Sequence, residues 1–327
     1  MQRLIIRRLL LAIPTLLVVS ILSFAIMKAA PGDPVRMYVA GGMSKGSQAD
    51  IARIRHNLGL DQPVPLQYLA WLRNLLSGNL GYSLASQRPV TQIILERLPA
   101  SISLMGISFL VAITLGVAVG VLSAVRQYSL FDYAATVLAF IGNSFPSFWI
   151  AMMLIWIFGV RLGWLPTGQM RSYQVNASPF IDYARHYVLP VATTSFVNLV
   201  TWVRYQRASL LEVLRQDYIR TARAKGLRER VVLLRHAWRN SLIPILTMIG
   251  FSVANLVGGS YIIETIFSWP GMGQLGFQSL LQRDYPVIMG VTLLSALFII
   301  AGNLLADILY IVANPQIRSG GEGAVVQ

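Results

Sequence analysis

The sequence has no cysteine and is poor in charged residues. The absence of cysteine excludes disulfides, thiolate metal sites, iron–sulfur clusters and a cysteine nucleophile. Charged residues make up 12% of the 327 residues, whereas hydrophobic residues make up 55%. A soluble domain contains about 25% charged residues, so an ordinary soluble enzyme is not expected. Lipid is the expected solvent for much of the chain.

Six stretches contain no charged residue and no histidine. A run of about 20 apolar residues crosses a bilayer as a helix, and five of the six stretches are long enough. The stretch 187–203 is short and rich in hydroxyl groups, so we expect it inside a helix bundle. The sequence therefore predicts an all-α polytopic membrane protein with six transmembrane helices. The stretches are 9–27, 99–125, 133–160, 187–203, 240–263 and 285–306.

The predicted spans also lack the ionisable groups that proton transport or catalysis inside a membrane requires. Proton-coupled carriers place ionisable residues inside the bilayer, and the six stretches have none. The sequence has no H-E-x-x-H zinc motif and no G-x-x-x-x-G-K-[ST] phosphate loop. His56, His186 and His236 share no metal-ligand spacing. We therefore predict no catalytic residue, no metal and no cofactor in this chain, and no enzyme activity.

The distribution of basic residues predicts the orientation in the membrane. Residues 204–239 hold ten Lys and Arg, and short basic loops stay in the cytoplasm. Because successive spans run in opposite directions, both termini are then predicted in the cytoplasm and residues 28–98 outside. A segment of this length crosses the membrane largely regardless of its charge. A signal peptide is the alternative interpretation of 9–27, but that apolar run is longer than the usual 7–15 residues. Basic residues are thus explained by topology, and no nucleic-acid partner is expected.

This orientation gives four predicted regions. They are an N-terminal transmembrane helix (1–29), an extracytoplasmic domain (30–98), a five-helix core (99–313) with a cytoplasmic loop at 204–240, and a cytoplasmic tail (314–327).

The cytoplasmic loop has the pattern of two amphipathic helices that meet at a glycine. Leu211, Leu214, Tyr218 and Ala222 form one helical stripe, and Gly226 suits a left-handed C-cap. A second stripe follows, formed by Val231, Leu234 and Trp238. Two interpretations fit: a helix that rests on anionic lipid head groups, or a helix pair that docks into another subunit.

Several segments together resemble one family of membrane proteins. Residues 217–227 (Asp-Tyr-Ile-Arg-Thr-Ala-Arg-Ala-Lys-Gly-Leu) and 235–244 resemble the EAA loop of ABC importer permeases, in the dipeptide, oligopeptide and nickel branch. The general motif of this loop begins with Glu-Ala-Ala. This sequence has Arg220, Thr221 and Ala222 at those positions, so the acidic residue is missing. Further matching segments, in the order of the first of two paralogous permeases, are 30–34, 58–63, 78–83, 264–273, 283–286 and 314–318.

The resemblance implies a fold, a function and partners. It implies a type I ABC importer permease-like fold that forms a path for di- or oligopeptides delivered by an extracytoplasmic substrate-binding protein. A second paralogous permease and two ATPases, which bind ATP and Mg²⁺, are the implied partners in a bacterial or archaeal inner membrane. Nickel chelate, glutathione and oligosaccharide are alternative substrates, and a self-sufficient secondary carrier or channel is the alternative of another class.

The resemblance and the polarity of the spans assign three sets of site residues. The residues implied to couple to the ATPase are Ala222, Arg223, Ala224, Lys225, Gly226 and Leu227. Candidates for lining the path, for which an interhelical hydrogen bond is the alternative role, are Asn143, Ser144, Asn198, Thr201, Asn255 and Asn303. Candidates for an outer gate, for which a membrane-surface turn is the alternative, are Trp269, Pro270, Gly271 and Gly273.

Overall fold

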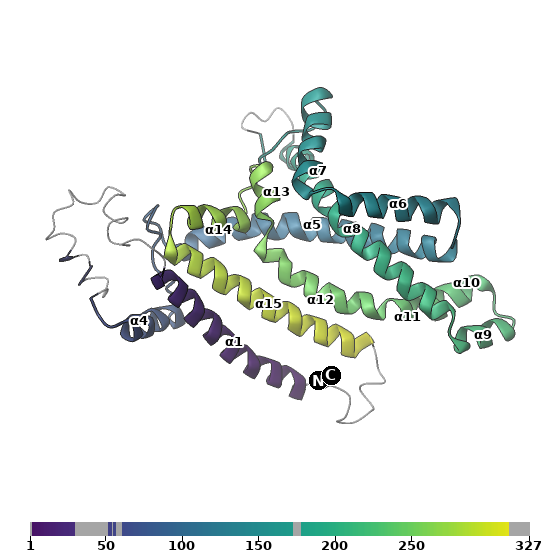
Figure 1. Ribbon diagram of the computed structural model, residues 1–327, viewed down its shortest axis with the longest axis horizontal. Helices are drawn as coiled ribbons and strands as arrows, with labels where there is room; N and C mark the ends of the chain where they lie inside the picture. The colour runs from purple at the N-terminus through teal and green to yellow at the C-terminus, as the bar shows by residue number, and fades with distance from the viewer. Residues whose placement is uncertain (1, 30–51, 54, 57–60, 173–177, 314–327) are drawn as a thin grey trace. The chain divides into compact units, whose positions relative to one another are not determined.

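A computed structural model describes residues 2–29, 52–53, 55–56, 61–172 and 178–313 (Figure 1). The described residues form helices, and an isolated antiparallel bridge joins Tyr82 and Pro89. The chain divides into two compact units. The first unit comprises Met1–Ser101, Val257–Tyr261 and Pro270–Phe298, and the second comprises Ile102–Leu256, Ile262–Trp269 and Ile299–Gln327.

Three helices are long and apolar enough to cross a membrane. They lie within α1 (Gln2–Ala29), α5 (Val90–Val125) and α15 (Tyr285–Ala313). A fourth span is possible where α6 (Leu130–Ser144) is followed by α7 (Ser147–Leu154) and the π-helix η2 (Ile155–Arg161). The expectation of an all-α polytopic membrane protein is confirmed, while the count of six spans stays a prediction.

Proline breaks one predicted span and leaves another intact. The helix α5 begins at Val90, before the predicted stretch 99–125, and continues through Pro99. Membrane helices tolerate proline where surrounding groups compensate for the missing hydrogen bond. Between α6 and α7, in contrast, Pro146 has an extended backbone (ψ 141°), and the two helical segments are bent by 102°.

The first unit has a core that joins α5, α14 (Met272–Leu281) and α15. Val90 and Ile94 of α5 pack with Met272 of α14 and Val287 of α15. The Asp284 carboxylate, just before α15, accepts hydrogen bonds from the Ser83 hydroxyl and from the Leu84 and Ala85 backbone N–H groups, at 3.0 and 3.4 Å for the latter two. Two segments of the sequence resemblance, 78–83 and 283–286, are thereby held together.

The second unit is organised around the 36-residue helix α8 (Pro179–Leu214). This helix contacts α6 and α7, and it approaches α5 closely at two glycines. A Cβ atom at Gly116 would lie 2.5 Å from Cβ of Trp202, and one at Gly120 would lie 2.8 Å from Cβ of Gln206. The two glycines therefore permit the backbones of α5 and α8 to pack without intervening side chains.

Candidate functional site

The basic loop between α8 and α12 (Ile243–Gly258) folds as four short helical segments. They are α9 (Asp217–Ala224), α10 (Glu229–Val231), the π-helix η3 (Val232–Trp238) and α11 (Arg239–Ser241). The sequence predicted one stripe from Leu211 to Ala222, but α8 ends at Leu214 and α9 begins at Asp217. The chain turns at residues 215–216, so α9 is a separate helix with its own inner face.

The inner face of α9 packs on the chain itself. Ile219 is fully buried and Ala222 is 7% exposed, and both contact a cluster that includes Leu210 of α8 and Val232 and Ala237 of η3. Ala222 therefore faces this core. The other five residues implied to couple to the ATPase, 223–227, are exposed.

Gly226 ends α9 in the left-handed conformation that the sequence predicts. Its φ is +77°, and its N–H donates to the Arg223 carbonyl at 2.9 Å. A side chain there would meet nothing within 4 Å, so the requirement for glycine comes from the backbone angle and not from space within the chain. The turn projects outward as an exposed tip made of Lys225, Gly226 and Leu227.

An ion pair joins the two sides of this turn. The Arg223 guanidinium donates to the Glu229 carboxylate through Nε at 3.1 Å and through an Nη at 2.7 Å. The hydrogen bond from Arg223 lowers the pKa of Glu229 below its usual value, and the bond to Glu229 raises the pKa of Arg223. Both side chains are about half exposed, at 45% and 56%. The pair orders the turn and leaves Lys225 as the outward cation at the tip.

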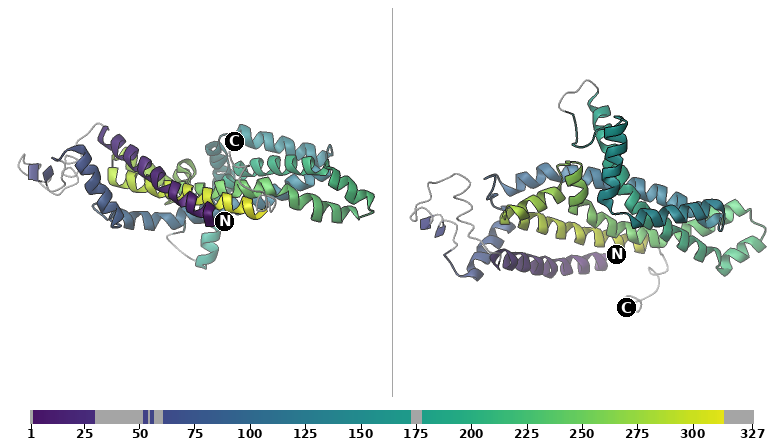
Figure 2. Two further views of the ribbon diagram at one scale, coloured as in Figure 1. Left: turned by 90° about the horizontal axis from the view of Figure 1, so that it is seen from below. Right: turned by 45° about the horizontal axis from the view of Figure 1, so that its top comes forward.

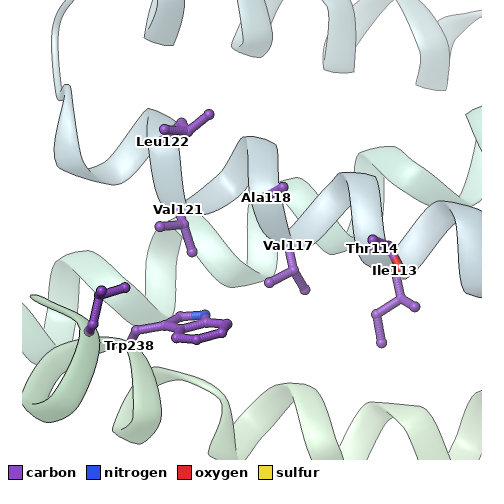
Figure 3. A pocket seen from close by; sticks show the side chains of 8 residues that line it. Ile113, Thr114, Val117, Ala118, Val121, Leu122 and Trp238 are labelled. Atoms are coloured by element: carbon purple, nitrogen blue, oxygen red, sulfur yellow. The ribbon is translucent and has the colours of Figure 1, made fainter.

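The second apolar stripe of the loop is shifted by the π-helical geometry of η3. Val232 and Ala237, five positions apart, are the buried residues, which agrees with the i to i+5 bonding of a π-helix. The predicted stripe residues Leu234 and Trp238 are 50% and 37% exposed. They form one wall of an apolar groove of about 530 Å³ (Figure 3). The opposite wall is α5, through Ile113, Thr114, Val117, Ala118, Val121 and Leu122.

A buried polar network connects the loop with α8. Ser241, which is fully buried, accepts a hydrogen bond from Gln206 Nε2 at 2.9 Å and donates to the Trp238 carbonyl at 2.8 Å. The Ser209 hydroxyl donates to the Ser241 carbonyl at 2.9 Å. Gln206 Oε1 is also buried and has no hydrogen-bond partner, so the network is only partly paired. The hydrogen bonds from Gln206 and Ser209 nevertheless tie the end of the loop to the part of α8 that packs against α9.

A buried carboxylate joins α8 to the turn between α5 and α6. Asp132 is 2% exposed, and its two oxygens accept from Nε and an Nη of Arg207 at 2.7 Å each. The Ser123 hydroxyl and the Tyr128 N–H, at 3.0 Å for the latter, complete its hydrogen bonding. We name Asp132 and Arg207 the α6–α8 clasp. Sequence reasoning missed it, because the two residues border charge-free stretches and no spacing links them.

The structure describes the side chains of four of the six candidate path residues. The Ser144 hydroxyl donates to the Phe140 carbonyl and the Asn198 amide to the Thr194 carbonyl, both at 2.8 Å, so each bonds within its own helix. Asn198 and Thr201 share an exposed face of α8, and Asn303 is half-buried on α15. The side chains of Asn143 and Asn255 lie outside what the structure describes.

The candidate gate residues include a fully buried tryptophan. The Trp269 ring makes an edge-to-face contact with Tyr187, with ring centroids 4.6 Å apart, and the Tyr187 hydroxyl donates to Ser103 at 2.7 Å. This burial removes the interpretation of Trp269 as an aromatic anchor at the membrane surface. Pro270 and Gly273 are half-buried, and Gly271 is buried directly before α14.

The histidines give no metal site among the described residues. His56 is exposed and bonds Asp61 at 2.7 Å. His186 is 5% exposed, and its Nδ1 lies 2.9 Å from the Asp182 carbonyl one turn earlier in α8.

The apolar helices and the structured basic loop place the chain among polytopic membrane transport components. A family profile described as "Binding-protein-dependent transport system inner membrane component" matches residues 116–319. Another, described as "Binding-prot-dependent transport system membrane comp, N-term", matches residues 1–105. The chain belongs to this family of ABC importer permeases, which are transport components and not enzymes.

Relatives of known designation cover nearly the whole chain. The oligopeptide transport system permease protein AppB of Bacillus subtilis is 44% identical over 315 residues, which is 96% of this chain and 98% of AppB. The glutathione transport system permease protein GsiC of Pectobacterium atrosepticum is 44% identical over 316 residues, with coverage of 96% and 98%. The recognition made from the sequence is confirmed.

A solved structure supports the fold. An inward-facing crystal form of the MetNI methionine ABC transporter has a chain that superposes with a TM-score of 0.54 at 16% identity. The match covers 68% of this chain and 97% of that one. At this identity the likeness concerns the fold alone, and it confirms the type I ABC importer permease fold.

Proposed function

We propose that this chain forms the translocation path for di- or oligopeptides in an ATP-driven importer. The observation that carries the proposal is the loop of α9 to α11, whose exposed tip at Gly226 stands on a buried core. A tip of this kind suits helix-in-groove docking, and the core beneath it ties any movement of the tip to α8. The similarity to AppB favours oligopeptides, and the similarity to GsiC makes glutathione the second candidate. Nickel chelates and oligosaccharides remain further alternatives.

The complex that we propose contains a second paralogous permease, two ATPases and an extracytoplasmic substrate-binding protein. ATP and Mg²⁺ bind to the ATPases, since this sequence contains no phosphate loop. Six spans place both termini and the tip at Gly226 in the cytoplasm, where the ATPases dock. The similarity of these elements to the family motifs supports this assembly.

We propose that the α6–α8 clasp carries movement of the loop to the spans. Docking at α9 acts on α8 through the shared apolar core and through Ser241. From α8 the two bonds of Arg207 to Asp132 reach the start of α6. The helices α6 and α7 are bent relative to each other at Pro146. Rotation of α6 therefore changes the angle between the two helices at this break.

Uptake by a reconstituted complex tests the function. The chain is co-purified with its neighbouring permease and ATPases, placed in liposomes, and supplied with binding protein and labelled di-, tri- and pentapeptides or glutathione. We expect ATP-dependent uptake of peptide only when every subunit is present. Uphill uptake by the isolated chain without ATP would contradict the proposal and favour a secondary carrier.

A further inference from the structure

The helix α4 (Val64–Leu76) keeps an apolar face that the part of the chain described by the structure leaves exposed. None of its 13 residues is buried, and it contains one charged side chain, Arg73. Leu66, Leu69 and Leu76 are 49%, 57% and 81% exposed. At three or four residues per turn they share a side with Arg73, while Asn74 lies on the polar side.

The other apolar side of α4 packs on the end of a membrane span. The Tyr68 hydroxyl lies 2.8 Å from the Ser20 hydroxyl of α1, and the rings of Tyr68 and Trp71 lie 5.4 and 6.0 Å from that of Phe24. Figures 1 and 2 show α4 beside the C-terminal end of α1. Both helices belong to the first unit.

The contact with Phe24 fixes the depth of α4. The apolar span of α1 extends to Ala29, and at 1.5 Å per residue Phe24 lies only about 7 Å before its end. Tyrosine and tryptophan favour this boundary between hydrocarbon and head groups. Near the same end, α1 leaves Leu22 and Ile26 56% and 70% exposed. Both helices therefore expose apolar side chains at the same depth.

We propose that α4 is an interfacial helix that binds the phospholipid surface. Leu66, Leu69 and Leu76 enter the acyl boundary, and Arg73 extends toward lipid phosphates, as long basic side chains do at such depth. Asn74 faces water. The helix thereby adds a membrane contact beside the C-terminal end of α1, and the inference depends only on α1 crossing the bilayer.

Single spin labels test the depth of each face, and the cysteine-free chain needs no background mutations. Leu69→Cys, Leu76→Cys and the matched control Asn74→Cys are labelled in the full chain, co-expressed with its partner subunits, in phosphatidylethanolamine and phosphatidylglycerol vesicles. Collision rates are measured with oxygen, which concentrates in lipid, and with a water-soluble nickel chelate. We expect a severalfold higher ratio of oxygen to nickel collisions at residues 69 and 76 than at residue 74.

Two results would overturn the proposal. Nickel collisions at residues 69 and 76 that equal those at residue 74 would place the face in water. Low collision rates with both reagents at residues 69 and 76 would show that a protein covers it. Quenching of a bimane fluorophore at Leu69→Cys by brominated lipid provides a second measurement, and unquenched fluorescence would also overturn the proposal.

Discussion

The helices α4 and α9 are both short and amphipathic, yet they differ in which side chains they bury and which they expose. The helix α4 buries none of its side chains and exposes leucines, with a single charge at Arg73. In contrast, α9 buries Ile219 and Ala222 and exposes a charged outer face. Exposed apolar side chains are stable only against lipid or protein, whereas a charged tip on a buried core suits a polar groove. The distribution of burial, more than amphipathicity itself, therefore indicates what each helix contacts.

Labelling with an impermeant thiol reagent gives the largest expected contrast between the two regions. A cysteine at Asn79, just after α4, should be labelled in intact cells, and one at Ala224 only after permeabilisation. Both positions are exposed. The reverse labelling pattern would invert the orientation and place α9 away from the ATPases.

Gly226→Asp should nearly abolish transport while the protein still inserts and folds. Aspartate at φ +77° strains the turn by about 1 kcal/mol, and its charge meets the unfavourable end of the α9 dipole. Loss of a coupling energy of about 1–3 kcal/mol would lower uptake roughly 5- to 150-fold. Uptake and membrane abundance are measured together.

Gly163→Asp is the matched control for Gly226→Asp. Gly163 also has a positive φ, +64°, with no atom within 4 Å of an added Cβ, and it lies in a turn after η2. Its uptake should stay close to that of the parent protein. An equal loss in both variants would assign the effect to backbone strain and not to coupling.

Arg207→Ala should uncouple transport from ATP hydrolysis to a smaller extent. It removes two charge-assisted hydrogen bonds from the buried Asp132, which keeps Ser123 and Tyr128 as donors, and breaking a buried pair in this way costs about 3–5 kcal/mol. We expect several-fold lower uptake per ATP hydrolysed, with unchanged pull-down of the ATPases. The exchanged pair Asp132→Arg and Arg207→Asp should recover part of the uptake. If the parent protein and Arg207→Ala take up the same number of peptides per ATP hydrolysed, the clasp has a packing role only.

The apolar spans within α1, α5 and α15 and the glycine turn were predictable because each depends on local sequence. A charge-free run predicts a membrane helix, and Gly226 after Lys225 predicts a left-handed cap. The clasp was not predictable, since Asp132 and Arg207 meet only when α6 packs on α8. The inner face of η3 was also missed, because a stripe drawn at α-helical spacing cannot reveal the π-helical register that buries Val232 and Ala237.

The Arg223–Glu229 pair should give the smallest effect, because exposed pairs contribute about 0.2–1 kcal/mol. Arg223 lowers the pKa of Glu229 in the folded protein, so the stabilisation is complete above the unfolded pKa of about 4.3. It is lost as the pH falls through the lower folded value. A spin label at Ala224→Cys should therefore keep constant mobility from about pH 8 to pH 5 and become more mobile only in stronger acid. Glu229→Gln should make the label more mobile at every pH, while Glu212→Gln, on α8, should not. A transition near neutral pH would contradict this origin of the ordering, because Glu229, whose pKa is lowered by Arg223, stays ionised there.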